Sequence, residues 1–377
     1  MNNPIKILIT GDTHLGGGRV KELAIREAKD QLFGKFSQLI QKADISITNL
    51  ESPLVDNGSP ILKTGPNLKS PISSLGVLKK AGFDLLTLAN NHIMDYGEAG
   101  LASTLDICSR TGLKTVGVGQ NFIDAQQPFT TEIQGLRISI INIAENEFGT
   151  TENESPGAHS LNPIQNYYRI KETSETSDYV LVIIHGGHEN YQLPSPRMKD
   201  TYRFFVDAGA SAVIGHHPHC YSGYEVYRNV PIFYSLGNFL FDKQNQDYSI
   251  WNEGIMVEFI VDDSGLDFEI IPYIQNDKDV GLRRLNQEER SFFDKKLSQL
   301  NKIISDKREL EKNFEEFCIS KRDLYSNFIE PHSFKYIHAL RNRNLFPSLL
   351  SKRKKRLLLN LTRCEAHRDI LQQILKL

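Results

Sequence analysis

Three histidines lie within four residues in the stretch VIGHHPHC, from Val213 to Cys220, where an apolar run ends in glycine. Imidazole nitrogens are common neutral ligands of transition metals. Two histidines that flank a proline at the end of a strand rarely pack as core side chains. His217 and His219 are therefore candidates for metal ligation, with an ordinary structural role as the alternative.

Similar side chains recur where other strand-like segments end. Each motif alone is also typical of a helix cap or a turn. That explanation would have to apply at five strand ends, and in an open α/β sheet the carboxyl ends of the strands share one crevice. The sequence therefore predicts one site, whose candidate residues are Asp12, His14, Glu51, Asn91, His92, His185, His217 and His219.

These residues supply carboxylate, imidazole and amide groups, and no thiolate. A centre with two metal ions needs several neutral imidazoles, a carboxylate that can bridge the ions, and open positions for water and substrate. Mixed nitrogen and oxygen ligands suit Mn²⁺, Fe²⁺ or Zn²⁺. We expect two divalent ions, with Mn²⁺ as the first expectation and Fe²⁺ or Zn²⁺ as alternatives.

The elements that would position these residues alternate between strand and helix. Short runs rich in β-branched residues predict strands, and amphipathic stretches between several of them predict helices. This order is typical of parallel strands with crossover helices, followed by hairpin pairing near the end. The predicted strands are 5–10, 44–50, 84–90, 114–119, 137–144, 179–185, 211–215, 231–236, 254–261 and 267–273, and the predicted helices are 26–42, 71–81, 98–111 and 196–208.

The composition is that of a globular protein, because 377 residues with 40% hydrophobic side chains can bury a large core. Its four cysteines are scattered without CxxC spacing, which argues against a disulfide framework and against a thiolate zinc site. The N-terminal apolar run is too short for a signal sequence, and no segment approaches eighteen consecutive apolar residues. We therefore expect a cytoplasmic protein with no transmembrane segment.

The C-terminal part differs in periodicity and charge. Residues 276–377 carry 23 Lys and Arg against 14 Asp and Glu, a net charge of +9, which leaves −11 for the first 275 residues. Apolar residues at helical spacing in 285–318 predict one long helix or two shorter ones, and a second helical block begins near Ser348 and contains KRKKR at 352–356. We predict a domain at 1–275 and a basic helical extension at 276–377.

Several motifs together resemble those of the CapA, or poly-γ-glutamate synthesis, family, a branch of the calcineurin-like metallophosphoesterases. The resemblance covers about residues 5–275 and implies a four-layer α/β/β/α sandwich with a dinuclear metal site, here with a C-terminal helical extension. The motifs are GDTHLG, NLESPL, LANNHIMDYGEAGL, HGGHE, DAGASAVIGHHPHCYSGYEVY and IFYSLGNFLFD.

The resemblance implies a role for each candidate. Glu51 matches the bridging carboxylate, Asp12, His14 and His219 match ligands of the first metal, and Asn91, His185 and His217 match ligands of the second. His92 is similar to the histidine that contacts the phosphoryl oxygen or the leaving group, and Asp95 could orient it. Apart from the resemblance, substrate contacts are expected from Glu189, Asn238 and Lys63, with a turn role as the alternative for Asn238 and an ordinary surface cation as the alternative for Lys63.

This chain departs from related sequences at three points. The bridging residue is glutamate where phosphoesterases typically have aspartate, a feature that the CapA branch shares. The usual HWGxEY reads HGGHEN, at 185–190. Better-known members carry an N-terminal membrane anchor that is not seen here, which weakens a role in polymer export.

The expected activity is metal-dependent hydrolysis of a phosphate ester in capsule or surface-polymer metabolism, with a small or polymeric anionic substrate. One alternative is an accessory or amide-ligase-type component of poly-γ-glutamate synthesis, working with other capsule-synthesis proteins and without phosphoesterase activity. Another is a binding or scaffold protein that uses its basic C-terminal helices. Such charge runs are usually solvated, and nothing points firmly to nucleic acid, since aromatic residues are not interleaved with the basic ones.

Overall fold

The computed structural model describes residues 3–63, 65–151, 153–243, 247–329, 334–348, 350–355 and 358. It divides into two compact units, residues 1–311 and 312–377. All predicted site residues belong to the first unit.

Within the described residues, the first sheet has eight strands and is built around β1 (Ile5–His14). Its order is β17-β16-β15-β1-β2-β3-β4, and β14 (Asn238–Phe241) pairs with the end of β1. The strands from β1 to β4 run parallel, and β15 to β17 form an antiparallel meander beside β1. The remaining bounds are β2 (Ile45–Leu50), β3 (Leu85–Thr87), β4 (Lys114–Val116), β15 (Glu253–Asp262), β16 (Gly265–Gln275) and β17 (Leu282–Arg284).

The second sheet has six strands in the described part of the chain, in the order β12-β13-β11-β10-β7-β6. Its centre is β10 (Tyr179–His185), where six consecutive residues are buried, as expected for a strand covered on both faces. The neighbours β7 (Leu136–Ala144) and β11 (Ala212–His216) run parallel to it. The outer strands are β6 (Phe129–Ile133), β12 (Tyr224–Tyr227) and β13 (Val230–Phe233).

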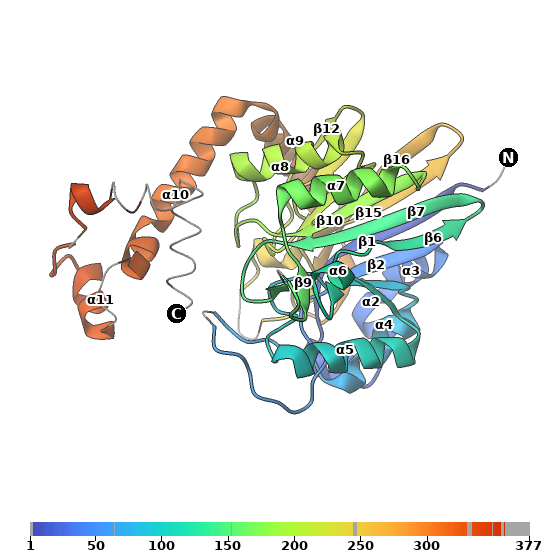
Figure 1. Ribbon diagram of the computed structural model, residues 1–377, viewed down its shortest axis with the longest axis horizontal. Coiled ribbons are helices and arrows are strands. Elements are labelled where there is room, and N and C mark those ends of the chain that lie inside the picture. The colour runs from blue at the N-terminus through green and yellow to red at the C-terminus, as the bar shows by residue number, and fades with distance from the viewer. Residues whose placement is uncertain are drawn as a thin grey trace. The chain divides into compact units, whose positions relative to one another are not determined.

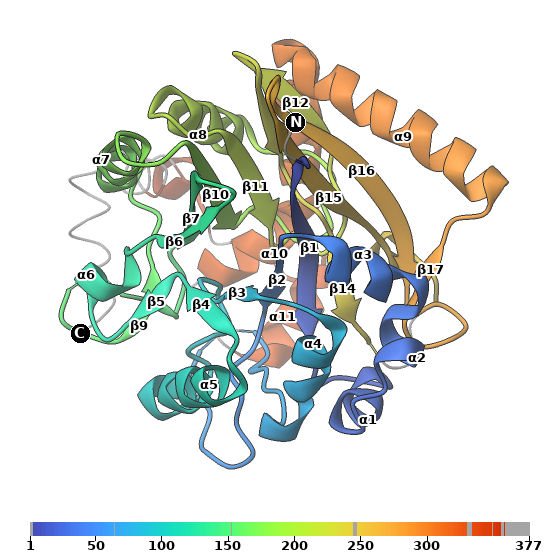
Figure 2. The same ribbon diagram turned by 90° about the vertical axis from the view of Figure 1, so that its right-hand side faces the viewer.

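The two sheets face each other, and helices cover their outer faces (Figures 1 and 2). Aliphatic residues of β1, β2, β10 and β11 meet in one buried cluster, and a second cluster joins the other face of the first sheet to its helices. The α/β four-layer sandwich predicted from the resemblance is confirmed. The helices beside the first sheet are α1 (Val20–Ile25), α2 (Lys29–Phe33), α3 (Ser37–Lys42), α4 (Gly76–Ala81) and α5 (Gly97–Thr111), and those beside the second are α7 (Pro163–Ser174) and α8 (Pro196–Asp207).

Local sequence signals explain where several helices begin. Ser195 caps α8 by accepting a hydrogen bond from the Met198 backbone, and Pro196 occupies the first turn. Asn162 and Pro163 start α7 in the same way. The smaller elements are α6 (Phe122–Ala125) and a three-stranded sheet of β5 (Val118–Gly119), β9 (Gly157–His159) and β8 (Thr150–Thr151).

The helix α9 (Gln287–Ser305) belongs to the compact unit that ends at Glu311. Phe293, Leu297, Leu300 and Ile304 of α9 join the cluster between the sheets. At the C-terminal end of α9, the buried ammonium of Lys199 donates to the carbonyl of Ile304, where a helix terminus favours a cation. The boundary at 275 between independent domains stays a prediction.

The described C-terminal residues contain α10 (Lys307–Ile329) and α11 (Lys335–Asn342). The two-helix alternative for 285–318 is the observed one. Residues 352–355 are helical, whereas Arg356 and most of the predicted block from 348 to the C-terminus lie outside the described residues. Among the described residues, no helix combines the length and the apolar character needed to cross a bilayer.

His159 makes stability depend on pH. It is 1% exposed, its Nδ1 donates to the Asn142 carbonyl at 3.0 Å, and Nε2 accepts from Asn166 at 2.9 Å, which leaves no acceptor for a second proton. Burial lowers the pKa of His159 from 6.5 to about 4. Because the unfolded chain takes up this proton near pH 6.5 and the folded chain does not, stability is lost as the pH falls towards 4.

Between pH 7.5 and 5, this one residue is expected to lower the free energy of unfolding by about 2 kcal/mol. Urea denaturation at both pH values measures the drop, and His159→Gln should lose less stability than the parent over the same interval. Equal drops in the two proteins would contradict this account.

Candidate metal centre

The predicted candidates come from strand ends on the facing edges of the two sheets. Asp12 lies near the end of β1, Glu51 follows β2, and Asn91 lies in the turn after β3. His185 ends β10, and His217 and His219 follow β11. The parallel pairing of β1 with β2 and of β10 with β11 brings these ends together.

The first group of ligand atoms contains Glu51, His185 and His217, all buried. The His185 Nε2 atom lies 3.2 Å from His217 Nδ1 and 3.6 Å from Glu51 Oε1. It also lies 3.0 Å from the side-chain oxygen of Asn91. Bonds of about 2.0–2.2 Å to a common cation would separate such atoms by about 3 Å, so these four side chains can share one ion.

The second group contains Asp12, Glu51 and His219, whose ligand atoms lie within 4.8 Å of one another. His219 Nε2 is 3.5 Å from Glu51 Oε1, and its Nδ1 donates to the Asn238 side-chain oxygen at 2.9 Å. That bond fixes the tautomer and leaves the Nε2 lone pair towards Glu51. Glu51 is the residue common to both groups, as a bridging carboxylate must be.

The environment of the Glu51 carboxylate shows whether a cation fits between the two ligand groups. The residue is 0% exposed, and among the described residues neither carboxylate oxygen has a hydrogen-bond partner. Burial and the nearby Asp12 raise the pKa of Glu51 well above its usual value. An unpaired buried carboxylate is costly, and cations on its two sides would compensate it. The donor set therefore fits two divalent ions.

Asp12 is held as an anion by its neighbours. It accepts hydrogen bonds from His216 Nδ1 at 3.0 Å, from the His217 backbone at 3.0 Å and from the Asn49 amide at 2.7 Å. Burial opposes ionisation, but the hydrogen bond from His216 and the nearby histidines keep the pKa of Asp12 below its usual value. Asp12 can thus offer a negative charge in the middle of the histidine cluster.

His14 is the predicted imidazole ligand that neither group includes. Its ring lies 4.9 Å from that of Phe241, and the His219 ring lies 5.0 Å from the same side chain. Burial and His92 lower the pKa of His14 to about 3, so the ring is neutral, and among the described residues its buried Nδ1 atom has no hydrogen-bond partner. Its role as a ligand of the first metal stays a prediction.

His92 and Asp95 form a buried pair next to the ligands. His92 Nδ1 lies 2.6 Å from Asp95 Oδ2, and the His92 backbone donates to the Asn90 side chain at 3.1 Å. This orientation reserves Nε2 for other contacts. The pair predicted to act on substrate is thus assembled directly after Asn91.

The three residues expected to contact substrate have different surroundings. Glu189 is exposed, and its charge contributes to the raised pKa of Glu51. The Asn238 side chain orients His219 and donates to the carbonyls of His219 and Trp251. The ammonium of Lys63 is paired with Asp95. Their substrate contacts stay predictions.

The backbone after β11 is strained. His217 has φ of 96° and His219 has φ of 56°, conformations that side chains other than glycine rarely adopt. Such strain persists only where the surroundings fix it, and it is common at binding sites. Here it turns both imidazoles towards Glu51.

Sequence reasoning missed residues that hold the ligands in place. Asn49 donates to Asp12 and lies 3.3 Å from His185 Nδ1, and Asn90 donates to the Asn49 side chain at 3.2 Å. Their position inside the NLE and ANNH motifs was the available signal. Glu145, directly after β7, accepts from the Gly187 backbone at 3.0 Å and had no such signal.

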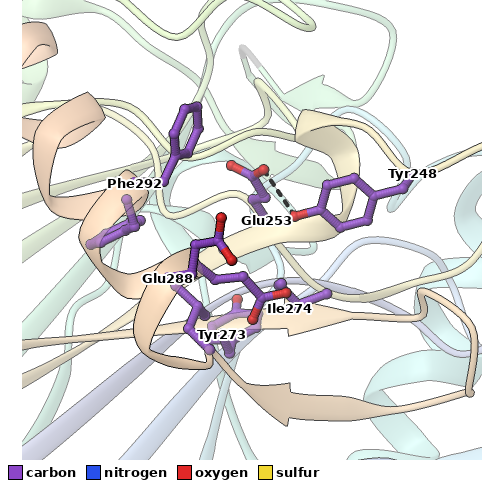
Figure 3. Close-up of a pocket in the computed structure, with 10 residues that line it drawn as sticks. Tyr248, Glu253, Tyr273, Ile274, Glu288 and Phe292 are labelled. Atoms are coloured by element: carbon purple, nitrogen blue, oxygen red, sulfur yellow. Dashed lines mark hydrogen bonds between the residues drawn. The ribbon is translucent and has the colours of Figure 1, made fainter.

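A separate cavity of about 320 Å³ lies between α9 and the strands β15 and β16 (Figure 3). Tyr248 donates to Glu253 at 3.0 Å within it, and Phe292 and Phe293 contribute apolar surface. Its lining contains no histidine and none of the predicted ligands. This cavity is therefore not part of the metal centre.

Comparisons with known proteins identify the family of the chain. Residues 6–243 match the family described as "Bacterial capsule synthesis protein PGA_cap". "Capsule biosynthesis protein CapA" of Bacillus anthracis is 32% identical over 273 residues, which cover 70% of this chain and 66% of that protein. "PGA biosynthesis protein CapA" of Bacillus subtilis (strain 168) is 30% identical over 262 residues, 68% of each chain.

Among solved structures, a hypothetical protein from Thermus thermophilus aligns with a TM-score of 0.46 and 14% identity, over 72% of this chain and 100% of that one. The alignments with the two CapA proteins span 66% and 68% of their lengths. The family match includes every predicted metal ligand, from Asp12 to His219. The chain belongs to the bacterial capsule synthesis protein PGA_cap family.

Proposed function

We propose that this protein is a metal-dependent hydrolase of a phosphate ester that serves the synthesis of a capsule polymer such as poly-γ-glutamate. The observation that carries the proposal is the pair of ligand groups that share Glu51, whose buried oxygens have no other partner among the described residues. The names of the two CapA relatives, which specify capsule and PGA biosynthesis, support the assignment to capsule-polymer synthesis.

The two groups would hold divalent ions, with Mn²⁺ as the expected metal and Fe²⁺ or Zn²⁺ as alternatives. Such ions polarise phosphoryl oxygens and lower the pKa of an attacking water. Asp12 and Glu51 would supply the negative charge that retains the ions. His219, oriented by Asn238, would present a neutral nitrogen to one ion.

His92 would act as the general acid that donates a proton to the leaving group. Asp95 accepts from Nδ1, so Nε2 is the atom that can donate. As the water oxygen bonds to phosphorus and the ester bond breaks, the departing oxygen would take the proton from Nε2. Asp95 then stabilises the ring in one orientation.

The second candidate is an accessory or amide-ligase-type role in polymer synthesis without phosphoesterase activity. The relatives' names favour it, because they specify biosynthesis and no hydrolytic reaction. The net charge of −11 on residues 1–275 disfavours a groove for an acidic polymer. The scaffold role of the basic tail and the cytoplasmic location stay predictions.

Metal analysis combined with a substrate screen tests the proposal. We expect about two transition-metal ions per purified chain and turnover of a phosphomonoester or phosphodiester. Chelation should abolish that turnover, and adding back Mn²⁺ should restore it. Two bound metals without turnover of any phosphate ester would favour the second candidate, and a chain that binds no metal would refute the proposed metal-dependent hydrolase.

A further inference from the structure

Asp95 joins the loop at residues 61–68 to His92. Its backbone carbonyl accepts from the Ile61 backbone at 2.9 Å and from the Asn67 side chain at 3.2 Å. Its carboxylate oxygen Oδ2 accepts from the Leu68 backbone at 2.6 Å and faces His92 Nδ1 at 2.6 Å. Asp95 therefore holds both the loop and the imidazole of His92 in place.

Lys63, which belongs to the same loop, also contacts Asp95 and His92. Its ammonium forms an ion pair with Asp95 Oδ1 and lies 3.2 Å from His92 Nδ1. The side chain of Lys63 is only 3% exposed and that of Asp95 1%, whereas the adjacent Leu62 is 100% exposed. Leu62 thus lies at the surface, while the side chain of the adjacent Lys63 reaches inward.

The charge on Asp95 explains why a lysine is needed. Oδ2 has two donors, but Oδ1 lies buried with Lys63 as its ion-pair partner. A buried carboxylate that loses its counter-charge is strongly destabilised, so the loop and the carboxylate would rearrange without the ammonium. An ammonium committed in this way is also not free to bind an anionic group of a substrate.

We infer that Lys63 is a positioning residue: it fixes Asp95 and loop 61–68, and through Asp95 it orients the His92 ring towards the metal centre. The catalytic part of this inference depends on the proposed function, because it takes His92 as the proton donor. The structural part, that Lys63 anchors the loop, does not.

Lys63→Met tests the inference, since it removes the charge and keeps the length of the side chain. We expect kcat to fall at least tenfold, KM to change less than twofold, and the metal content to stay at two ions. Hydrogen exchange of a peptide covering 61–68 should accelerate. Lys63→Arg should restore part of kcat and of the protection, and Lys79→Met, at an exposed lysine of α4, should match the parent.

A double-mutant cycle separates positioning from substrate binding. In a His92→Gln background, Lys63→Met should lower kcat no further, because the ring it orients is gone. A KM that rises in both backgrounds, with unchanged exchange in the loop, would overturn the inference. If no phosphate ester is turned over by the parent, the proposed function fails, and unchanged exchange in Lys63→Met would then separately refute the anchoring role.

Discussion

Glu51→Gln is expected to abolish metal binding at both positions and to reduce turnover to background. Glu51 is the residue common to the two ligand groups, so the amide removes the bridging charge from both at once. Metal content of the purified variant, measured by elemental analysis, should fall from about two ions per chain to none. Replacing an outer ligand such as Asn91 should cost less, because it belongs to one side only.

The same substitution should stabilise the metal-free protein. The parent must bury a carboxylate without a partner, and an uncompensated buried polar group costs about 1–3 kcal/mol, or more when it is charged. The amide keeps the shape and carries no charge. In the presence of chelator, the variant should therefore unfold at a higher temperature than the parent, whereas added Mn²⁺ should raise the melting temperature of the parent alone.

Glu132→Gln is the matched control, because Glu132 is exposed on β6 and belongs to neither ligand group. It should keep the metal content, the activity and the melting temperature of the parent. A Glu51→Gln protein that retains two ions would show that the carboxylate does not bridge them.

His92→Ala is expected to keep both metals and lose turnover. General acid catalysis by a positioned histidine contributes about 10²–10⁴-fold, and His92 contributes no atom to the ligand groups. We expect kcat to fall by this factor for substrates with a poor leaving group. The loss should be smaller for an aryl phosphate, because its leaving group needs no proton.

The comparison of these two classes of substrate separates proton donation from a structural role. A structural defect would slow both substrates alike and would alter the metal content. A His92→Ala enzyme as active as the parent on alkyl phosphate esters would remove His92 from the mechanism.

Buried strands were the most predictable elements. The run YVLVIIH predicted 179–185, which is β10, because continuous β-branched residues between turn signals have few other arrangements. The strand β14 was missed, since SLGNFLF resembles a turn and gains its pairing from β1, more than two hundred residues away. The helix α7 was missed although Asn162 and Pro163 mark its start.

The metal ligands could be predicted from the sequence because most of them lie at the carboxyl ends of predicted strands. Asp12, Glu51, His185, His217 and His219 lie at the ends of strands or directly after them, so a parallel topology is enough to bring them together. The partners of Lys63 were not predictable, because its position depends on the path of an irregular loop.

The position of β1 has a consequence for how the chain is made. Over its first half its neighbours in the sheet are β2 and β15, and the register pairs Ile5 with Val261. At about 5–20 residues per second, a ribosome would deliver β15 roughly 10 to 50 s after β1. During that interval one edge of an apolar strand has no partner, so the nascent chain passes through a stage that favours aggregation. Residues beyond 243, which the family match does not include, are thus required to complete the sheet that carries Asp12.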